Sequence, residues 1–200
     1  LHILYFYKKT SKMKIYIKNM VCHRCIMVVQ SELEKSGFTP LSVSLGEVVF
    51  EKDLAVSDQQ IIAKTLQNVG FEIIEDKKKQ GVEKVKNLII DLVQNQNSAL
   101  KNTLSDYLST QLDCDYKYIT TLFTELEGTT IEKYFIAQKI EKVKELLVYN
   151  ELTLSEIAFQ LQYSSVAHLS NQFKSVTGLT PSYFKNLRDD RRIPLDQVKA

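Results

Sequence analysis

The sequence has no tryptophan, only three prolines and six glycines, and only three cysteines among its 200 residues. So few chain-breaking residues exclude a protein that is mostly loop or disorder. Two of the cysteines, Cys22 and Cys25, lie three positions apart, which excludes the disulfide framework of a small secreted domain. No apolar run approaches the roughly 20 residues of a membrane-spanning helix. We therefore expect no membrane partner, no secretory signal and a cytoplasmic location.

Neither sign of charge predominates, since the chain has 26 basic and 24 acidic residues and a net charge of +2. That net charge is too small to indicate a nucleic-acid partner by itself, so the local distribution has to decide. Residues 101–132 carry two basic residues against six acidic ones, whereas residues 160–192 carry five against two. A phosphate-binding surface is therefore expected late in the chain.

The first third of the chain alternates between strand-like and helix-like patterns. Residues 13–18 (MKIYIK) have the period-two alternation of a half-buried strand, and Gly46 separates two later apolar runs as a hairpin turn does. The predicted elements are strand 13–18, helix 26–35, strand 41–45, strand 48–50, helix 58–69, which Ser57 precedes, and strand 71–74. This β-α-β-β-α-β order predicts an α+β domain with the ferredoxin-like fold.

A different periodicity begins after the charged stretch EDKKKQ at residues 75–80, which predicts a domain boundary. Residues 82–95 have the apolar spacing of a helix that joins the two halves, and the pattern after them is helical almost throughout. Because Met13 stands at the start of the first predicted strand, residues 1–12 are expected to be a tail or an upstream extension. The predicted plan is tail 1–12, ferredoxin-like domain 13–76, linker and connecting helix 77–100, all-α domain 101–189 and tail 190–200.

The most specific pattern lies in residues 154–188, where two helices are predicted on either side of a short turn. The second helix has Leu169 and Phe173 facing inward four positions apart, and Ser164 or Ser165 can cap its first turn. A helix held in this way can place its outward residues in a major groove.

These residues resemble the AraC/XylS family. The matching segments are IA at 157–158, YSS at 163–165, HLSNQFK at 168–174, Gly178 and TPSYFKNLR at 180–188. Upstream, residues 108–123 are similar to the family's first unit and residues 139–147 to the helix that joins its two units. The resemblance covers about residues 100–188. It implies tandem helix-turn-helix units that bind double-stranded DNA, in a bacterial transcription regulator and not an enzyme.

The resemblance also implies which residues meet DNA. Side chains on the second helix of each unit face base edges, and basic residues nearby contact phosphates. The base-reading positions are Lys117, Thr120 and Thr121 in the first unit and Ser165, Ala167, Asn171 and Gln172 in the second, with Lys174, Lys185 and Arg188 toward phosphate. Because the basic residues gather in the second unit, we predict that this unit anchors the protein on DNA.

The cysteine pair belongs to the motif M-x-C-x-x-C, which begins at Met20 after the first predicted strand. Two thiolates at a helix N-terminus can converge on one soft ion, such as Cu(I) or Zn(II), and His23 is a candidate third ligand. With the β-α-β-β-α-β order, residues 13–76 resemble the heavy-metal-associated domain of copper chaperones and metal-transporting ATPases. That resemblance implies Cys22 and Cys25 as metal ligands and a metal ion as effector.

Several alternatives stay open at this point. The cysteine pair can instead serve thiol exchange or redox sensing, or the domain can bind partners without any metal. The whole chain can be a metal carrier, or a protein-interaction protein, with a degenerate helix-turn-helix module. The resemblance permits monomers and dimers alike.

Overall fold

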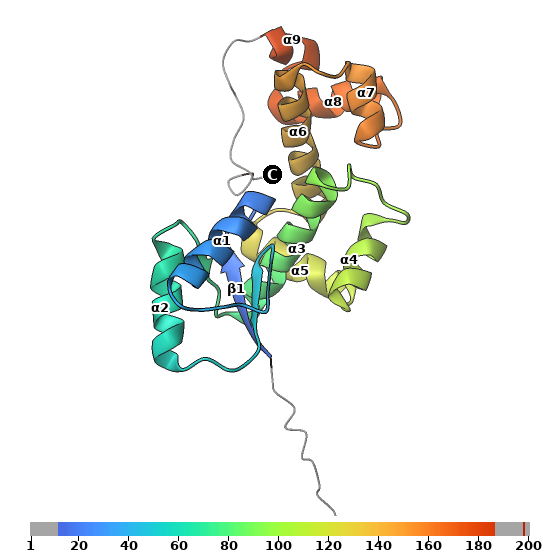
Figure 1. Cartoon of the computed structure of the whole chain (residues 1–200). Coiled ribbons are helices and arrows are strands. Elements are labelled where there is room, and N and C mark those ends of the chain that lie inside the picture. Colours follow the sequence, from blue (N-terminus) through green and yellow to red (C-terminus); the bar gives the residue numbers. More distant parts are fainter. Residues whose placement is uncertain (1–11, 187–197, 199–200) are drawn as a thin grey trace, which may run out of the picture. The chain divides into compact units, whose positions relative to one another are not determined.

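The computed structural model describes residues 12–186 and residue 198, and it divides the chain into two compact units, Leu1–Gln80 and Gly81–Ala200 (Figure 1). Apart from Lys12 and Val198, the predicted tails lie outside the described residues. None of the described helices is both long enough and apolar enough to cross a membrane.

The first unit is built on a four-stranded sheet in which every neighbouring pair of strands is antiparallel. The strand order is β2-β3-β1-β4, so the first strand lies between the third and the fourth. The strands are β1 (Met13–Lys18), β2 (Ser42–Ser44), β3 (Glu47–Phe50) and β4 (Glu72–Ile73). The element order β-α-β-β-α-β that the sequence predicts is confirmed.

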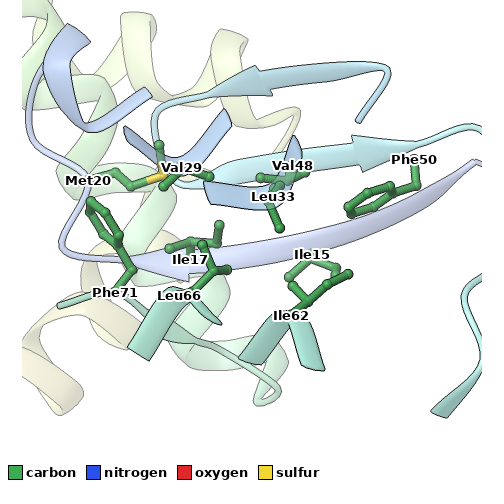
Figure 2. Close-up of a cluster of buried hydrophobic side chains, with 10 residues drawn as sticks. All are labelled: Ile15, Ile17, Met20, Val29, Leu33, Val48, Phe50, Ile62, Leu66 and Phe71. Atoms are coloured by element: carbon green, nitrogen blue, oxygen red, sulfur yellow. The ribbon is translucent and has the colours of Figure 1, made fainter. Parts of the chain in front are cut away.

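Two helices, α1 (His23–Lys35) and α2 (Val56–Gln67), pack against the sheet. Ile15 and Ile17 alternate with more exposed neighbours along β1 and point into the core that the helices cover. Figure 2 shows this core, where the labelled side chains of Met20 and Phe71 lie together at one end. Burying such a set of apolar side chains is what stabilises a small α/β unit.

The helix boundaries differ from the predicted ones by a few residues. The first helix begins three residues earlier than predicted, because Cys22 adopts the extended backbone of an N-cap. The second begins at Val56 with Ala55 as its N-cap, so Ser57 lies inside the first turn. Periodicity locates helices better than it locates their ends, because caps depend on backbone conformation.

The second unit is helical. Its elements are α3 (Lys77–Gln94), α4 (Leu104–Leu112), α5 (Tyr116–Glu127), α6 (Ile131–Tyr149), α7 (Leu154–Gln160), α8 (Val166–Thr177) and α9 (Pro181–Asn186). The N-terminal half of α6 shares a core with α3, α4 and α5, where Tyr134 meets Phe123 edge-on at 5.6 Å between ring centroids. Its C-terminal half shares a second core with α7, α8 and α9, which gather at one end of α6 in Figure 1.

The structure differs from the expected plan at α3, which was predicted as a linker and connecting helix. Val82, Val85 and Ile89 are buried in the same core as Leu108 and Phe123. The apolar stripe that suggested a connecting helix is thus covered by the first helix-turn-helix unit. The boundary between the two compact units falls inside α3, between Gln80 and Gly81, rather than in an irregular charged segment.

The helical unit contains an internal repeat in which equivalent residues lie fifty positions apart. Thr103 and Thr153 each form a capping box, with Asp106 and Glu156 respectively. A glycine with a left-handed backbone conformation ends the second helix of each repeat. Other residues adopt this conformation only with strain. The equivalent pairs are Thr103 and Thr153, Asp115 and Ser165, Ile119 and Leu169, Phe123 and Phe173, and Gly128 and Gly178. The first repeat (residues 103–128) and the second repeat (residues 153–178) therefore have the same local construction.

Candidate functional site

Helix α8 presents a polar face to solvent. Its N-cap is Ser165, one of the two serines predicted to cap this helix. The Oγ of Ser165 accepts a hydrogen bond from the backbone N–H of His168 at 3.0 Å. Leu169 and Phe173 on the opposite side are fully buried. The predicted DNA-facing residues Ala167, Asn171 and Lys174 are all exposed.

Gln172, by contrast, is half-buried and faces the turn that precedes the helix. Its Oε1 accepts a hydrogen bond from the hydroxyl of Tyr163 at 2.8 Å. Burial raises the pKa of Tyr163 well above its usual value, so the phenol remains a neutral donor. The ring of His168 stands edge-on to Tyr163, with 5.4 Å between centroids, and its Nδ1 lies 3.0 Å from Ser164 Oγ. Two polar side chains of α8 are thus held by one tyrosine.

The remaining phosphate-contact predictions fall on or after α9. Lys185 is exposed in the last turn of that helix, whose Pro181 and Phe184 are buried. Phe184 meets Phe173 edge-on at 5.5 Å between ring centroids, so α9 is fixed against α8. Arg188 lies outside the described residues.

Helix α5 is the equivalent helix of the first repeat, and the hydroxyls of Thr120 and Thr121 form hydrogen bonds to its own backbone. Thr120 Oγ1 donates to the carbonyl of Tyr116 at 2.8 Å, and Thr121 Oγ1 donates to that of Lys117 at 2.9 Å. With their protons committed to the backbone, both hydroxyls offer only acceptor lone pairs outward. Thr121 and Lys117 are exposed, while Thr120 is half-buried.

The surroundings of α5 are acidic. Its N-cap is Asp115, whose carboxylate accepts from the backbone N–H of Lys117 at 2.9 Å, where α8 has the neutral Ser165. Tyr116 donates from its hydroxyl to the carboxylate of Glu132 at 2.5 Å, and burial together with that contact raises the pKa of Tyr116 to about 12. Asp113 and Glu125 are exposed nearby. Negative charge at a helix N-terminus stabilises the helix but opposes an approaching phosphate.

The two cysteines lie at the N-terminus of α1. Their Sγ atoms are 3.5 Å apart and both side chains are half-buried. Burial raises the pKa of Cys25, which opposes the expected stabilisation of a thiolate by the helix dipole. Met20 is fully buried and His23 is exposed. Among the described residues, no group of three or more His, Cys, Asp or Glu side chains is placed to hold a metal ion.

Sequence reasoning missed Lys139, a buried cation in the middle of α6. It lies three residues after Ile136 and four before Val143, both of which pack in the second core, and Gln138 and Glu141 of the same helix are buried as well. The residue is only 8% exposed, and its Nζ lies 3.9 Å from the centroid of the Tyr163 ring. The signal in the sequence was a lysine at a position where the helical periodicity predicts a buried residue, and this could have revealed Lys139 as a buried cation.

Comparison with known proteins fits this arrangement. A family model described as a helix-turn-helix domain matches residues 108–186. Residues 108–186 are therefore a helix-turn-helix domain, the kind of domain that the sequence predicts for this part of the chain. The helix-turn-helix domain thus spans α5 to α9, which include both predicted DNA-facing helices, and the C-terminal half of α4.

Two known proteins are similar to this chain in sequence. The Transposon Tn10 TetD protein of Escherichia coli is 31% identical over 68 residues, which are 34% of this chain and 49% of that protein. The HTH-type transcriptional activator RhaR of Salmonella dublin is 25% identical over 162 residues, which are 80% of this chain and 53% of that protein. The chain therefore spans about half the length of these relatives. The relatives of stated activity are transcription regulators and not enzymes, as predicted for this chain.

Two solved structures are similar to part of this chain. The C-terminal domain of AraT, a response regulator from Geobacillus stearothermophilus, has 23% identity and a TM-score of 0.48, covering 59% of this chain and 91% of that one. The C-terminal domain of the two-component response regulator yesN from Fusobacterium nucleatum has 29% identity and a TM-score of 0.45, covering 52% of this chain and 99% of that one.

Proposed function

We propose that this chain is a sequence-specific transcription regulator that binds double-stranded DNA, in the cytoplasm of a bacterium. The observation that carries the proposal is α8, an exposed polar helix fixed from behind by Leu169 and Phe173 inside a helix-turn-helix domain. A helix of this kind fits the major groove, where side chains can read base edges.

The side-chain chemistry supports a division of labour on α8. Asn171 is exposed and can pair with the N6 and N7 edge of adenine. The carboxamide oxygen of Gln172 is engaged by Tyr163, so its NH₂ group is the part available to an acceptor such as guanine O6 or thymine O4. Lys174 and Lys185 are exposed, and their ammonium groups contact DNA phosphates.

The test is selection of duplexes by the full chain from a randomised library, followed by titration of the enriched duplex at several salt concentrations. We expect an enriched sequence and a log–log salt slope of about −0.9 for each phosphate contact. Asn171→Ala should relax the base preference at one position, whereas Lys174→Ala should reduce affinity for every duplex and flatten the slope. Lys64→Ala, an exposed lysine of the first unit, is the matched control. A folded protein that enriches no sequence and shows no salt-dependent binding would instead support a protein-interaction role.

For the first unit we propose the ferredoxin-like fold of a heavy-metal-associated domain, with Cys22 and Cys25 as ligands of a Cu(I) effector. The strand order and the two sulfurs 3.5 Å apart support this assignment. Zn(II) in proteins takes four ligands, whereas the described residues offer a pair of thiols, so the donor set favours Cu(I) over Zn(II).

Titration of the full chain with Cu(I) under a competing chelator tests the effector. We expect one Cu(I) per chain, its loss in Cys22→Ser and Cys25→Ser, and a change in affinity for the enriched duplex when Cu(I) is bound. Cys114→Ser, which alters the third thiol, is the control and should bind Cu(I) as the native chain does. Tight Cu(I) binding without any DNA binding would support the metal-carrier alternative.

A further inference from the structure

We propose that Lys139, a buried residue of α6, is a positioning residue for DNA reading by α8. Its ammonium group holds the ring of Tyr163, and that ring in turn orients two polar side chains of the reading helix. The inference rests on the proposed function, because it concerns how α8 is presented to DNA.

The contact between Lys139 and Tyr163 has the geometry of a cation–π interaction. The Nζ atom lies 3.9 Å from the Tyr163 ring centroid and 5.6 Å from that of Phe135, so the cation is within cation–π range of two aromatic rings. Among the described residues, the ammonium group makes no ion pair. The neighbouring lysines Lys142 and Lys144 do pair with carboxylates of the same helix, at 3.4 Å and 3.1 Å.

Tyr163 transmits this contact to α8. It lies in the turn between α7 and α8, and its hydroxyl donates to Gln172 Oε1 at 2.8 Å. His168 stands edge-on to the same ring and is anchored at Nδ1 by Ser164. The path from Lys139 to the exposed face of α8 therefore consists of directional contacts. A change in the ring position alters the amide and imidazole groups of α8 together.

The energetics argue that Lys139 is not there for stability. Burial lowers its pKa to about 8, which means that the cation is disfavoured by its surroundings even though the ring face attracts it. An uncharged side chain of similar length would fill the same space against Tyr163 and Phe135 without that desolvation. A group that is unfavourable for folding and directional in its contacts is expected at functional sites.

The first repeat lacks this arrangement. The position fifty residues before Tyr163 is Asp113, and the one fifty residues before Gln172 is Leu122. Asp113 has a left-handed backbone and an exposed side chain, and Leu122 is buried. The aromatic contact is thus confined to the repeat that we expect to anchor the protein.

The test compares Lys139→Met, Lys139→Arg and the control Lys133→Met, which removes the same charge from an exposed position of α6. The probes are the duplex that the native chain enriches and a random-sequence duplex of equal length. We expect Lys139→Met to lose about tenfold in affinity for the enriched duplex, the equivalent of one cation–π contact, and to bind the random duplex like the control. Lys139→Arg retains a cation over the ring and should recover most of that loss.

Thermal melting of the same variants separates positioning from stability. We expect Lys139→Met to melt no lower than the native chain, because it removes a buried charge. Equal affinity of Lys139→Met and Lys133→Met for the enriched duplex would overturn the proposal. If Lys139→Met misfolds, Tyr163→Phe decides: it keeps the ring and loses the bond to Gln172. We then expect a several-fold loss for the enriched duplex alone, and an unchanged affinity would overturn the proposal. A native chain that enriches no duplex would instead refute the proposed function.

Discussion

The two repeats of the helical unit share a scaffold and differ in charge. Each has a capping box on its first helix, a buried phenylalanine at the centre of its second helix and a left-handed glycine after it. The N-cap of the second helix is Asp115 in one repeat and Ser165 in the other, and the acidic residues gather around the former. The residues that form the core are therefore separate from those that set the surface charge. The two repeats can keep the same fold while their attraction for phosphate differs.

The largest effect is expected from breaking the core of either repeat. Phe123 and Phe173 are both fully buried, and truncation to alanine should lower the free energy of unfolding by about 3–5 kcal/mol in each case. Urea unfolding of the full chain measures this loss. Equal losses would support equivalent cores. A loss below about 1 kcal/mol for one of them would mean that its repeat is loosely packed.

The next effect concerns the ranking of the repeats on DNA. Lys174→Ala should weaken binding to the enriched duplex by about tenfold, the order expected for one charge-assisted phosphate contact. Lys117→Ala, in the acidic first repeat, should weaken it by less than about threefold. Gel shifts at fixed salt compare the two variants. Equal losses would contradict the prediction that the second repeat anchors the protein.

A smaller effect is expected from exchanging the helix caps. Ser165→Asp keeps a good N-cap but adds a negative charge to α8, and Asp115→Ser does the reverse on α5. We expect DNA affinity to fall several-fold for the first and to rise about twofold for the second, since a helix terminus interaction with charge is worth about 0.3–1 kcal/mol. Melting temperatures should stay close to native. If neither variant changes affinity, the caps do not face phosphate.

A pH dependence of stability is expected from Lys139 in α6. Its pKa is about 8 in the folded chain, below the ordinary value of 10.5, so the unfolded chain binds more protons between these values. Stability should therefore rise as the pH increases from about 8 to about 10.5 and should gain nothing from this group below pH 8. Lys139→Met lacks the group, so the difference between its unfolding free energy and the native value should change over that range. A constant difference would contradict the lowered pKa.

Local patterns in the sequence predict much of this structure, and contacts between distant segments account for what they miss. The alternation at Ile15 and Ile17, the turn at Gly46 and the cap at Ser165 are local features, and each is confirmed. The exposed face of α8 follows from the inward spacing of Leu169 and Phe173. These features depend on residues a few positions apart, which periodicity and capping rules describe.

The missed features depend on pairs that are far apart in sequence. The role of α3 required knowing that Val82 and Val85 meet Leu108 rather than solvent. The cation over Tyr163 joins residues that are 24 positions apart in sequence (139 and 163), and the raised pKa of Cys25 reflects burial that no spacing rule predicts. The assignment of individual side chains to bases and phosphates stays a prediction.

Helix α6 contributes side chains to two cores, which makes it a spacer of fixed length. Its 19 residues correspond to about 28 Å of helix, somewhat less than the 34–36 Å of one turn of DNA. We expect the segments read by the two repeats to recur on one side of the double helix, about ten base pairs apart. Lengthening α6 by a single residue would rotate one core against the other by about 100° and take the two reading surfaces out of phase.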